Sequence, residues 1–296
     1  MKNIIIVTGG AGFVGSNLID LLLRKTKFRI ISLDNYSSGS KKNHIKNKRV
    51  RYLNCHTKNI SKKLGSEKKK INAIFHFGEF ARIYQSFLLM NRCIDSNTIG
   101  SNEVFNFCMK NKIKLIYSAT SASLGNKGND KNLSPYSFTK AKNLELLNNL
   151  KKWFNFKFEI IYFYNVYGPK QICSGKMATV IGIFEDHFKK KLPLPIVKPG
   201  NQSRRFTHIQ DTVRTCFKAW KLNKCRHYSI SSKKEYSILK VAKMFKTKIK
   251  YLLARPGERY ASALTNMNLS KKIHKYFGKK SLKEYINAIK GALHGV

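Results

Sequence analysis

The chain has 296 residues, and 42% hydrophobic content is enough for a core in one large α/β domain or in a nucleotide-binding domain with a smaller partner. No apolar run approaches the length of a membrane span, and the apolar start gives way at once to glycines, which argues against a signal peptide. The six cysteines lie singly, without the spacing of a zinc site or a disulfide framework. We therefore expect no bound metal and a reducing, cytoplasmic location.

The formal net charge of +43 arises from 58 Lys and Arg against 15 Asp and Glu. Alone, such a charge would indicate a nucleic acid, an anionic membrane or an acidic substrate as partner. The basic runs at 40–48, 66–72 and 188–193 are spread along the chain and are mostly lysine. A compositional bias that gives solvated surfaces explains this pattern better than one binding patch, so we expect no specific nucleic-acid partner and no membrane span.

In chain order, the first elements are an apolar strand at 3–8, a glycine turn, an apolar-periodic helix at 13–25 and a second strand at 28–34. Strand-like and helix-like runs then alternate, with strands expected at 73–77, 114–119 and 158–164 and helices at 97–111 and 136–152. Alternation of this kind predicts a doubly wound parallel sheet of the Rossmann type, with helices on both faces.

The pattern becomes less regular after residue 169, where prolines and basic loops increase. We predict a dinucleotide-binding domain over 1–168 that also carries the catalytic residues. A smaller substrate-binding lobe is expected over 169–296, with some of its segments returning to the first domain.

Three glycines, Gly9, Gly12 and Gly15, follow the first strand and open the first helix. In this context glycines allow a tight turn, a close approach to a pyrophosphate and a helix N-terminus aimed at it. Asp34 ends the second strand about twenty residues later, where a carboxylate can accept hydrogen bonds from a ribose 2′-hydroxyl and repel a 2′-phosphate. The sequence therefore predicts NAD rather than NADP.

Tyr136 and Lys140 lie four residues apart at the start of a predicted helix, on one face. A phenol titrates near ~10 in water, and a neighbouring ammonium with a positively charged nicotinamide would favour its ionised form. Tyr136 could then act as a general base near neutral pH. Such a pair occurs by chance in a lysine-rich chain, but this pair follows YSATSASLG by one strand-helix step, which gives it more weight.

The motifs, taken in order, resemble the extended short-chain dehydrogenase/reductase family, in its NAD-dependent nucleotide-sugar epimerase/dehydratase branch, closest to the UDP-hexose 4-epimerases. The resemblance covers nearly the whole chain. It rests on TGGAGFVGSN, HFGEFA, NTIGS, YSATSASLG, YSFTK, NVYGP, RRFTHIQD and RPGE.

This resemblance implies residue roles. Thr120, Tyr136 and Lys140 would be catalytic, with Lys140 also orienting the cofactor ribose, and Asn165, Arg204 and Arg255 would grip the nucleotide diphosphate. Arginine forks suit phosphate oxygens. Ser262, seven residues after Arg255, would be the gate beside the sugar C2 substituent, and its small size predicts that UDP-N-acetylhexosamine is accepted. The residues expected to hold the cofactor are Gly9, Gly12, Phe13, Val14, Gly15, Asp34, Asn35, Phe77, Gly78, Asn97, Tyr136 and Lys140.

The implied reaction inverts C4 of a UDP-hexose or UDP-N-acetylhexosamine through a transient 4-keto intermediate, with no net redox. A 4,6-dehydratase or a 4-keto reductase of the same family remains an alternative, although Ser121 and Ala122 stand where dehydratases carry Asp and Glu. A non-enzymatic alternative is an NAD-binding scaffold with a basic interaction surface. The resemblance also suggests a homodimer formed by the helices near 97–111 and 136–152.

Two histidines have structural interpretations: His76 ends a predicted buried strand, and His208 matches a structural histidine of the family. The region 54–59, NCHTKN, departs from the family pattern, which often has an Asp near the adenine. Contacts to the adenine are therefore not predicted.

Overall fold

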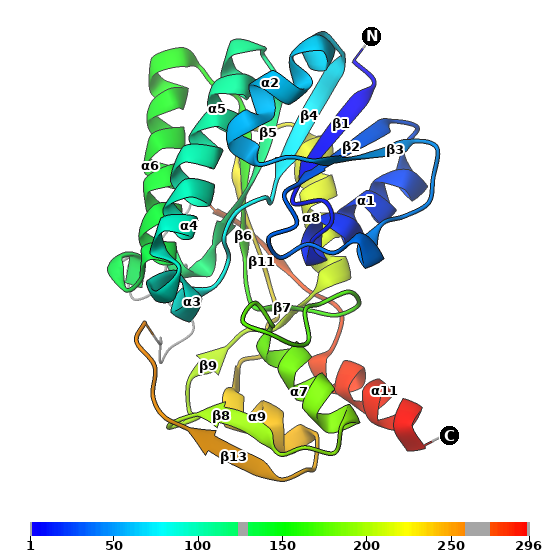
Figure 1. Ribbon diagram of the computed structural model, residues 1–296, viewed down its shortest axis with the longest axis vertical. Helices are drawn as coiled ribbons and strands as arrows, with labels where there is room; N and C mark the ends of the chain where they lie inside the picture. Colours follow the sequence, from blue (N-terminus) through cyan, green and yellow to red (C-terminus); the bar gives the residue numbers. More distant parts are fainter. Residues whose placement is uncertain (1, 124–129, 258–272, 295–296) are drawn as a thin grey trace.

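A parallel sheet of eight strands forms the centre of the computed structural model, which describes residues 2–123, 130–257 and 273–294 (Figure 1). The strands follow the order β14-β11-β6-β5-β4-β1-β2-β3. Their bounds are β1 Ile4–Thr8, β2 Arg29–Asp34, β3 Val50–Asn54, β4 Ile71–His76, β5 Lys114–Thr120, β6 Phe158–Phe163, β11 His227–Ser231 and β14 Ile273–Phe277. This confirms the predicted doubly wound α/β fold.

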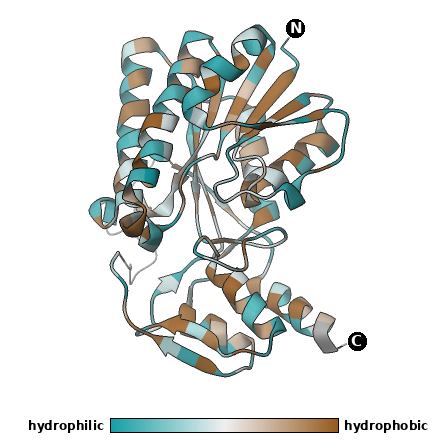
Figure 2. Cartoon of the chain, viewed as in Figure 1, coloured by the Kyte–Doolittle hydropathy of each residue, from teal (hydrophilic) through white to brown (hydrophobic). Residues whose placement is uncertain are grey.

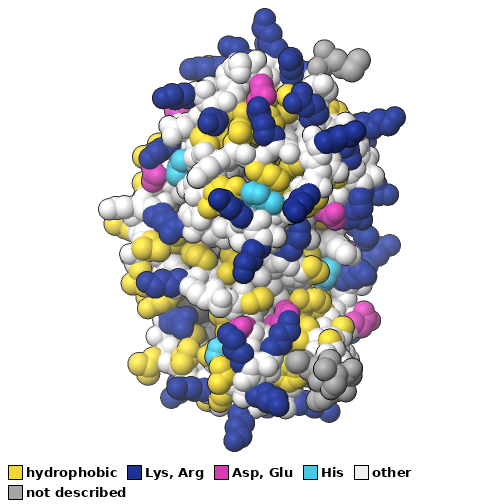
Figure 3. All heavy atoms as spheres, turned by 45° about the vertical axis from the view of Figure 1, so that its right-hand side comes forward, with side chains coloured by type: hydrophobic (Ala, Val, Ile, Leu, Met, Phe, Trp, Pro, Cys, Tyr) yellow, Lys and Arg dark blue, Asp and Glu magenta, His cyan; other side chains and the backbone are white. Residues whose placement is uncertain are grey.

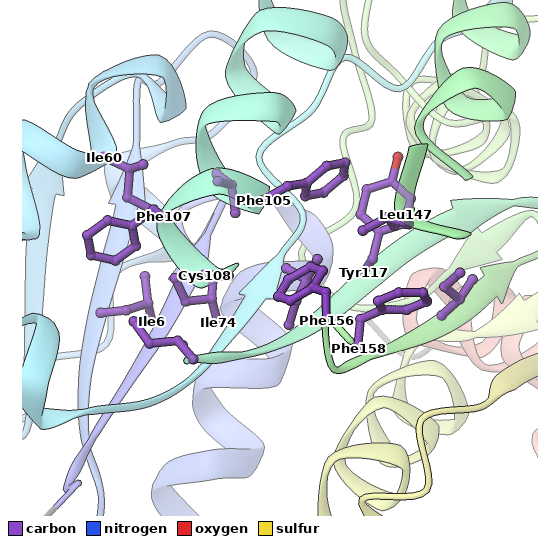
Figure 4. Close-up of a cluster of buried hydrophobic side chains, with 14 of the residues drawn as sticks. Ile6, Ile60, Ile74, Phe105, Phe107, Cys108, Tyr117, Leu147, Phe156 and Phe158 are labelled. Carbon is purple, nitrogen blue, oxygen red and sulfur yellow. The ribbon is translucent and has the colours of Figure 1, made fainter. Parts of the chain in front are cut away.

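Helices cover both faces of the sheet because its strands are apolar on both sides. Ile5 and Val7 of β1 pack with α1 (Phe13–Lys25) and α8 (Ile209–Leu222) on one face. Ile4 and Ile6 point to the other face, which is covered by the helices α2 (Ile60–Leu64), α5 (Ser101–Lys110) and α6 (Pro135–Phe154). Figure 4 shows this second cluster, in which aromatic rings such as Phe105 and Phe158 fill the space between helices and sheet.

The smaller lobe lies beyond the carboxyl ends of the strands and has its own apolar core (Figure 1). Its helices are α7 Val180–Lys189, α9 Ile238–Met244 and α11 Leu282–His294. Pairs of short strands complete it: β8 Leu194–Val197 with β13 Ile249–Leu252, β9 Ser203–Arg204 with β12 Tyr236–Ser237, and β7 Val166–Tyr167 with β10 Thr207–His208. The chain returns to the large sheet twice, first through α8 and β11 and later through β14, and α11 follows in the smaller lobe.

Short helical segments connect the main elements. These are α3 Ile83–Leu88, α4 Met90–Ile94, the π-helical turn η4 Asp95–Gly100, and the 3₁₀ turns η1 Lys41–Asn43, η2 Thr57–Asn59, η3 Gly65–Lys70 and η5 Ser121–Ser123. The predicted helix at 97–111 is therefore a π turn followed by α5. Figure 2 shows hydrophobic residues on the strands and the inward sides of the helices, with hydrophilic residues outside.

Basic side chains are scattered over the molecular face in Figure 3 and do not gather in one patch. This arrangement agrees with the even spread of lysine along the sequence. Among the described residues, none of the helices combines the length and the hydropathy that a membrane crossing requires.

Candidate functional site

A cavity of about 850 Å³ extends from the glycine turn after β1, along the ends of β4, β5 and β6, to the smaller lobe. It lies where ligands bind in doubly wound sheets, outside the carboxyl ends of the strands. Most of the predicted site residues line it: Gly9, Gly12, Phe13, Val14, Gly15, Asp34, Asn35, Phe77, Gly78, Thr120, Tyr136, Lys140, Asn165, Arg204 and Arg255. The fold thus brings together residues from most of the chain.

The glycine turn is packed too tightly for a side chain at Gly9 or at Gly15. A Cβ added to Gly15 would lie 2.2 Å from the Gly9 carbonyl oxygen, and Gly9 itself has a φ of +67°. Helix α1 begins after Gly12, whose position provides no side-chain cap. The first amides of α1 are therefore available to an anion, as a pyrophosphate requires.

Asp34 holds the neighbouring loops in place beside this turn. Its Oδ2 accepts a hydrogen bond from the Ala11 amide (3.0 Å) and its Oδ1 accepts one from the Tyr36 amide (2.8 Å). Burial raises the pKa of this carboxyl, while the backbone donors act in the opposite direction. The geometry fits a ribose subsite, because a carboxylate has lone pairs beyond those used by the two amides.

The three predicted catalytic residues come from two neighbouring elements. Thr120 ends β5, and its Oγ1 accepts a hydrogen bond from the Ala122 amide (3.2 Å). Tyr136 and Lys140 lie on the first turns of α6, which begins after the capping residue Ser134. The Ser134 hydroxyl accepts from the Ser137 amide (3.1 Å), so the start of this helix is fixed locally.

Lys140 is almost completely buried and pairs with Glu79, a residue that the motif analysis did not single out. The lysine Nζ donates to the Glu79 carboxylate and to the Ser118 carbonyl oxygen (2.5 Å). A signal for Glu79 was present in the sequence, since FHFGEF places one carboxylate among aromatic residues directly after a buried strand. Unpaired charges are rarely buried in such surroundings.

His76 is fully buried behind this pair and connects β1 to α5. Its Nδ1 lies 2.7 Å from Thr8 Oγ1 and its Nε2 lies 2.9 Å from Ser101 Oγ. Burial lowers the pKa of His76 to about 4. The imidazole is therefore neutral near pH 7 and packs within the wall, as its position at the end of a buried strand predicts.

Asn97 does not line the cavity. Its side-chain carbonyl accepts from the Phe80 amide (2.6 Å), and its NH₂ group donates to the Phe80 carbonyl (3.0 Å) and to Thr139 Oγ1 (3.1 Å). The residue fixes the segment that carries Glu79 against η4 and α6. A direct cofactor contact of Asn97 remains a prediction.

The end of the cavity near the smaller lobe carries several basic side chains. The Arg255 guanidinium lies 5.0 Å from the centroid of the Tyr84 ring, and Arg204 is buried beside Ser203. Arg82 was not predicted, and it also lines the cavity, with Nε and Nη2 donating to the Met177 carbonyl (2.9 and 2.5 Å). The predicted gate, Ser262, lies outside the described residues.

Within residues 2–123, 130–257 and 273–294, no group of three His, Cys, Asp or Glu side chains is arranged to hold a metal ion. Fold and cavity together define a dinucleotide-binding protein of the Rossmann class, with a tyrosine–lysine pair at the cavity wall.

A model of the NAD dependent epimerase/dehydratase family matches residues 5–231, and the chain belongs to this family. The match confirms the family predicted from the motifs, its NAD cofactor and an enzyme of epimerase type.

A relative in sequence agrees with this family, and two solved structures share the fold. A putative UDP-glucose 4-epimerase of Methanocaldococcus jannaschii is 29% identical over 233 residues, which covers 73% of this chain and 74% of that protein. The UDP-glucose 4-epimerase of Thermotoga maritima, solved with UDP-glucose, has a TM-score of 0.85 at 22% identity and 99% coverage of both chains. The dTDP-glucose 4,6-dehydratase of Streptomyces venezuelae, solved with NAD, has a TM-score of 0.86 at 18% identity, covering 98% of this chain and 97% of that one.

The glycine turn gives a direct test of the cofactor cradle. Gly15→Ala should weaken NAD binding at least ~100-fold, roughly 3 kcal/mol, because the new methyl group overlaps the Gly9 carbonyl. Binding is measured by calorimetry, and Gly65→Ala is the matched control, since a Cβ there meets nothing within 4 Å. Equal NAD affinity in Gly15→Ala and wild type would contradict this account of the cradle.

The neutral His76 predicts a pH dependence of folding. Because its folded pKa is lowered to about 4, below the unfolded value near ~6.5, the stabilisation is complete above ~6.5 and is lost as pH falls towards 4. In wild type, protonation of His76 should lower the free energy of unfolding by about 3 kcal/mol across this window. In His76→Gln this part of the fall should be missing. Urea unfolding between pH 7 and 4 measures it, and parallel pH profiles of variant and wild type would contradict it.

Proposed function

We propose that the protein is an NAD-dependent epimerase that inverts C4 of a nucleotide sugar, with a UDP-hexose or a UDP-N-acetylhexosamine as substrate. The observation that carries the proposal is the convergence of Thr120, Tyr136 and Lys140 on one cavity that begins at the glycine turn. The names of the M. jannaschii and T. maritima proteins agree with this activity.

The cradle fits NAD because the glycine turn leaves room for backbone to approach a pyrophosphate and Asp34 stands where the adenosine ribose would lie. A negative charge at that position disfavours the 2′-phosphate of NADP. When bound, NAD supplies a reversible hydride acceptor for the sugar carbon.

The chain's own residues would handle the proton. Tyr136 would take the C4 hydroxyl proton as the sugar is oxidised and return it as the sugar is reduced. Thr120 would hydrogen-bond the same oxygen, and Lys140 would orient the cofactor ribose and favour the phenolate. One residue thus serves as base and then as acid, so the reaction leaves no net change in the protein.

Inversion requires the keto sugar to turn while the rest of the substrate stays fixed. Asn165, Arg204 and Arg255 lie on the side of the cavity that meets the smaller lobe, where they would hold the diphosphate. The sugar would then present its opposite face to the cofactor. The nature of the C2 substituent accepted depends on the proposed gate at Ser262.

A 4,6-dehydratase or a 4-keto reductase is the second candidate, since the fold matches the S. venezuelae dehydratase as well as it matches the epimerases. Elimination of water needs an acid and a base near C5 and C6 of the sugar. Ser121 and Ala122, which follow Thr120 and are buried, supply neither. A scaffold without enzymatic activity would retain NAD, bind heparin in a salt-sensitive manner and turn over no sugar.

Product analysis with a catalytic variant tests the proposal. Wild type should convert UDP-glucose to UDP-galactose, or UDP-N-acetylglucosamine to its C4 epimer, as read by NMR. Tyr136→Phe should lower kcat more than tenfold, at least ~1.4 kcal/mol in barrier, while NAD affinity stays within about threefold. A 4-keto-6-deoxy product would identify the dehydratase instead.

We further propose a cytoplasmic homodimer. All six cysteines are free thiols, which suits a reducing compartment. An apolar groove between α3, α4 and the start of α6 exposes Phe87 (40%), Met90 (53%) and Phe138 (44%), and a second copy of the chain would cover it.

The dimer is tested by light scattering coupled to gel filtration. Phe138→Glu should shift the protein from dimer to monomer, because a buried unpaired carboxylate opposes association. Leu253→Glu, at an 84% exposed position of the smaller lobe, is the control and should remain a dimer. A monomeric wild type would refute the proposal.

A further inference from the structure

Glu79 is a buried carboxylate next to the proposed catalytic lysine, and nothing in the proposed reaction uses it. Its side chain is 2% exposed, and that of Lys140 is 5% exposed. A buried carboxylate is tolerated only when it is paired and hydrogen-bonded. The surroundings of Glu79 therefore indicate which group it serves.

One carboxylate oxygen of Glu79 is fixed by three donors from three elements. Its Oε1 accepts from Ser101 Oγ (2.8 Å), Tyr117 Oη (3.0 Å) and Asn143 Nδ2 (3.1 Å). These residues belong to α5, β5 and α6. The orientation of the carboxylate is thus determined before any ligand binds, and its second oxygen, Oε2, faces Lys140.

The ammonium of Lys140 has three N–H donors. One donates to Glu79 Oε2 and one to the Ser118 carbonyl oxygen, at the end of β5, and the ammonium lies 4.7 Å from the centroid of the Tyr117 ring. Two donors are thus committed on the protein side. The third is left for the cavity that Lys140 lines.

We propose that Glu79 is a positioning residue that fixes the Lys140 ammonium against β5 and balances its charge, so that Tyr136 retains its proton to a higher pH than a lone lysine would allow. This inference rests on the proposed function of the Tyr136–Lys140 pair. In this role Glu79 determines where the Lys140 ammonium points and how strongly its charge acts on Tyr136.

Glu79 balances the charge of Lys140, because the other titratable groups packed around these two residues supply no negative charge near pH 7. Burial lowers the pKa of His76 to about 4 and raises the pKa of Cys93 to about 11, so both are neutral near pH 7. Burial also raises the pKa of Tyr117 far above its usual value. Arg82 is the second cation near Tyr136, and its guanidinium donates to backbone carbonyls.

Charge removal and displacement can be separated with two variants. Glu79→Gln keeps the shape and removes the negative charge, so the uncompensated ammonium should favour the phenolate of Tyr136. Glu79→Asp keeps the charge but withdraws it by one methylene, so Lys140 should lose its position. The control is Glu159→Gln, which removes another buried carboxylate, paired with Lys114 (2.8 Å), at the start of β6, whereas the cavity is lined by the other end of that strand.

The first measurement does not need turnover. Ultraviolet titration of tyrosinate in the NAD-bound protein, taken as the difference between each variant and the same variant carrying Tyr136→Phe, isolates Tyr136 from the other tyrosines. The midpoint in Glu79→Gln should fall by about one pH unit, the effect expected for a unit charge within ~10 Å in a partly polar interior. In Glu159→Gln it should stay within about 0.3 unit of wild type, and in Glu79→Asp, which keeps the negative charge, the fall should be smaller than in Glu79→Gln.

The second measurement is the pH profile of kcat. Its acid limb should move to lower pH in Glu79→Gln, as the tyrosinate midpoint does. Glu79→Asp should keep the acid limb and lose about tenfold in kcat. An unchanged tyrosinate midpoint in folded Glu79→Gln, or an unchanged kcat in Glu79→Asp, overturns the proposal. If wild type turns over no nucleotide sugar, the proposed function fails, while the tyrosinate midpoints still decide the role of Glu79.

Discussion

Parallel pairing of all eight strands is the constraint on which the site depends. Because the strands run in one direction, the carboxyl ends of β1, β4, β5 and β6 lie at the same edge of the sheet. Gly9, Phe77, Thr120 and Tyr164 follow or end these strands and line one cavity. The packing of apolar residues on both faces keeps the strands in register, so the positions of the polar groups at this edge follow from the core behind them.

The sequence predicted those parts of the fold that local chemistry determines. The unit from β1 to β2 was visible because an apolar run, a glycine turn and a 3.6-residue periodicity occur together. Strand β3 was not predicted, since none of its residues is fully buried and they include the exposed Arg51 and Asn54. Some segments of the smaller lobe were expected to return to the first domain, but β11 and β14 and their places in the sheet were not named, because strand order depends on contacts between distant segments.

The same division applies to the site. Tyr136 and Lys140 could be proposed because their spacing on one helix is local, whereas the partners of Lys140 come from the segment after β4 and from β5. Glu79 and Arg82 received no role from the sequence, because their partners, Lys140 and Met177, lie far along the chain. Burial and hydrogen bonding in three dimensions identified them.

Three buried acidic residues of this basic protein share one use. Asp34, Glu159 and Asp211 are buried, and each accepts hydrogen bonds from backbone amides, at 3.0 Å from Ala11, 2.7 Å from Arg226 and 3.0 Å from Lys279. Carboxylates held by amides join loops that lack a neighbour in a sheet. The solvent-facing surface can thus be strongly basic while the interior keeps its anions.

The return of the chain from the smaller lobe to the large sheet has a mechanical consequence. The lobe is attached not by one linker but through the segments around β7, β10, β11 and β14, which enter and leave it at separate points. A movement that widened the cavity would have to bend these connections together, and β11 and β14 are themselves held by ladders to β6 and to each other. The separate connections therefore resist a hinge-like opening of the space between the lobes more than a single linker would.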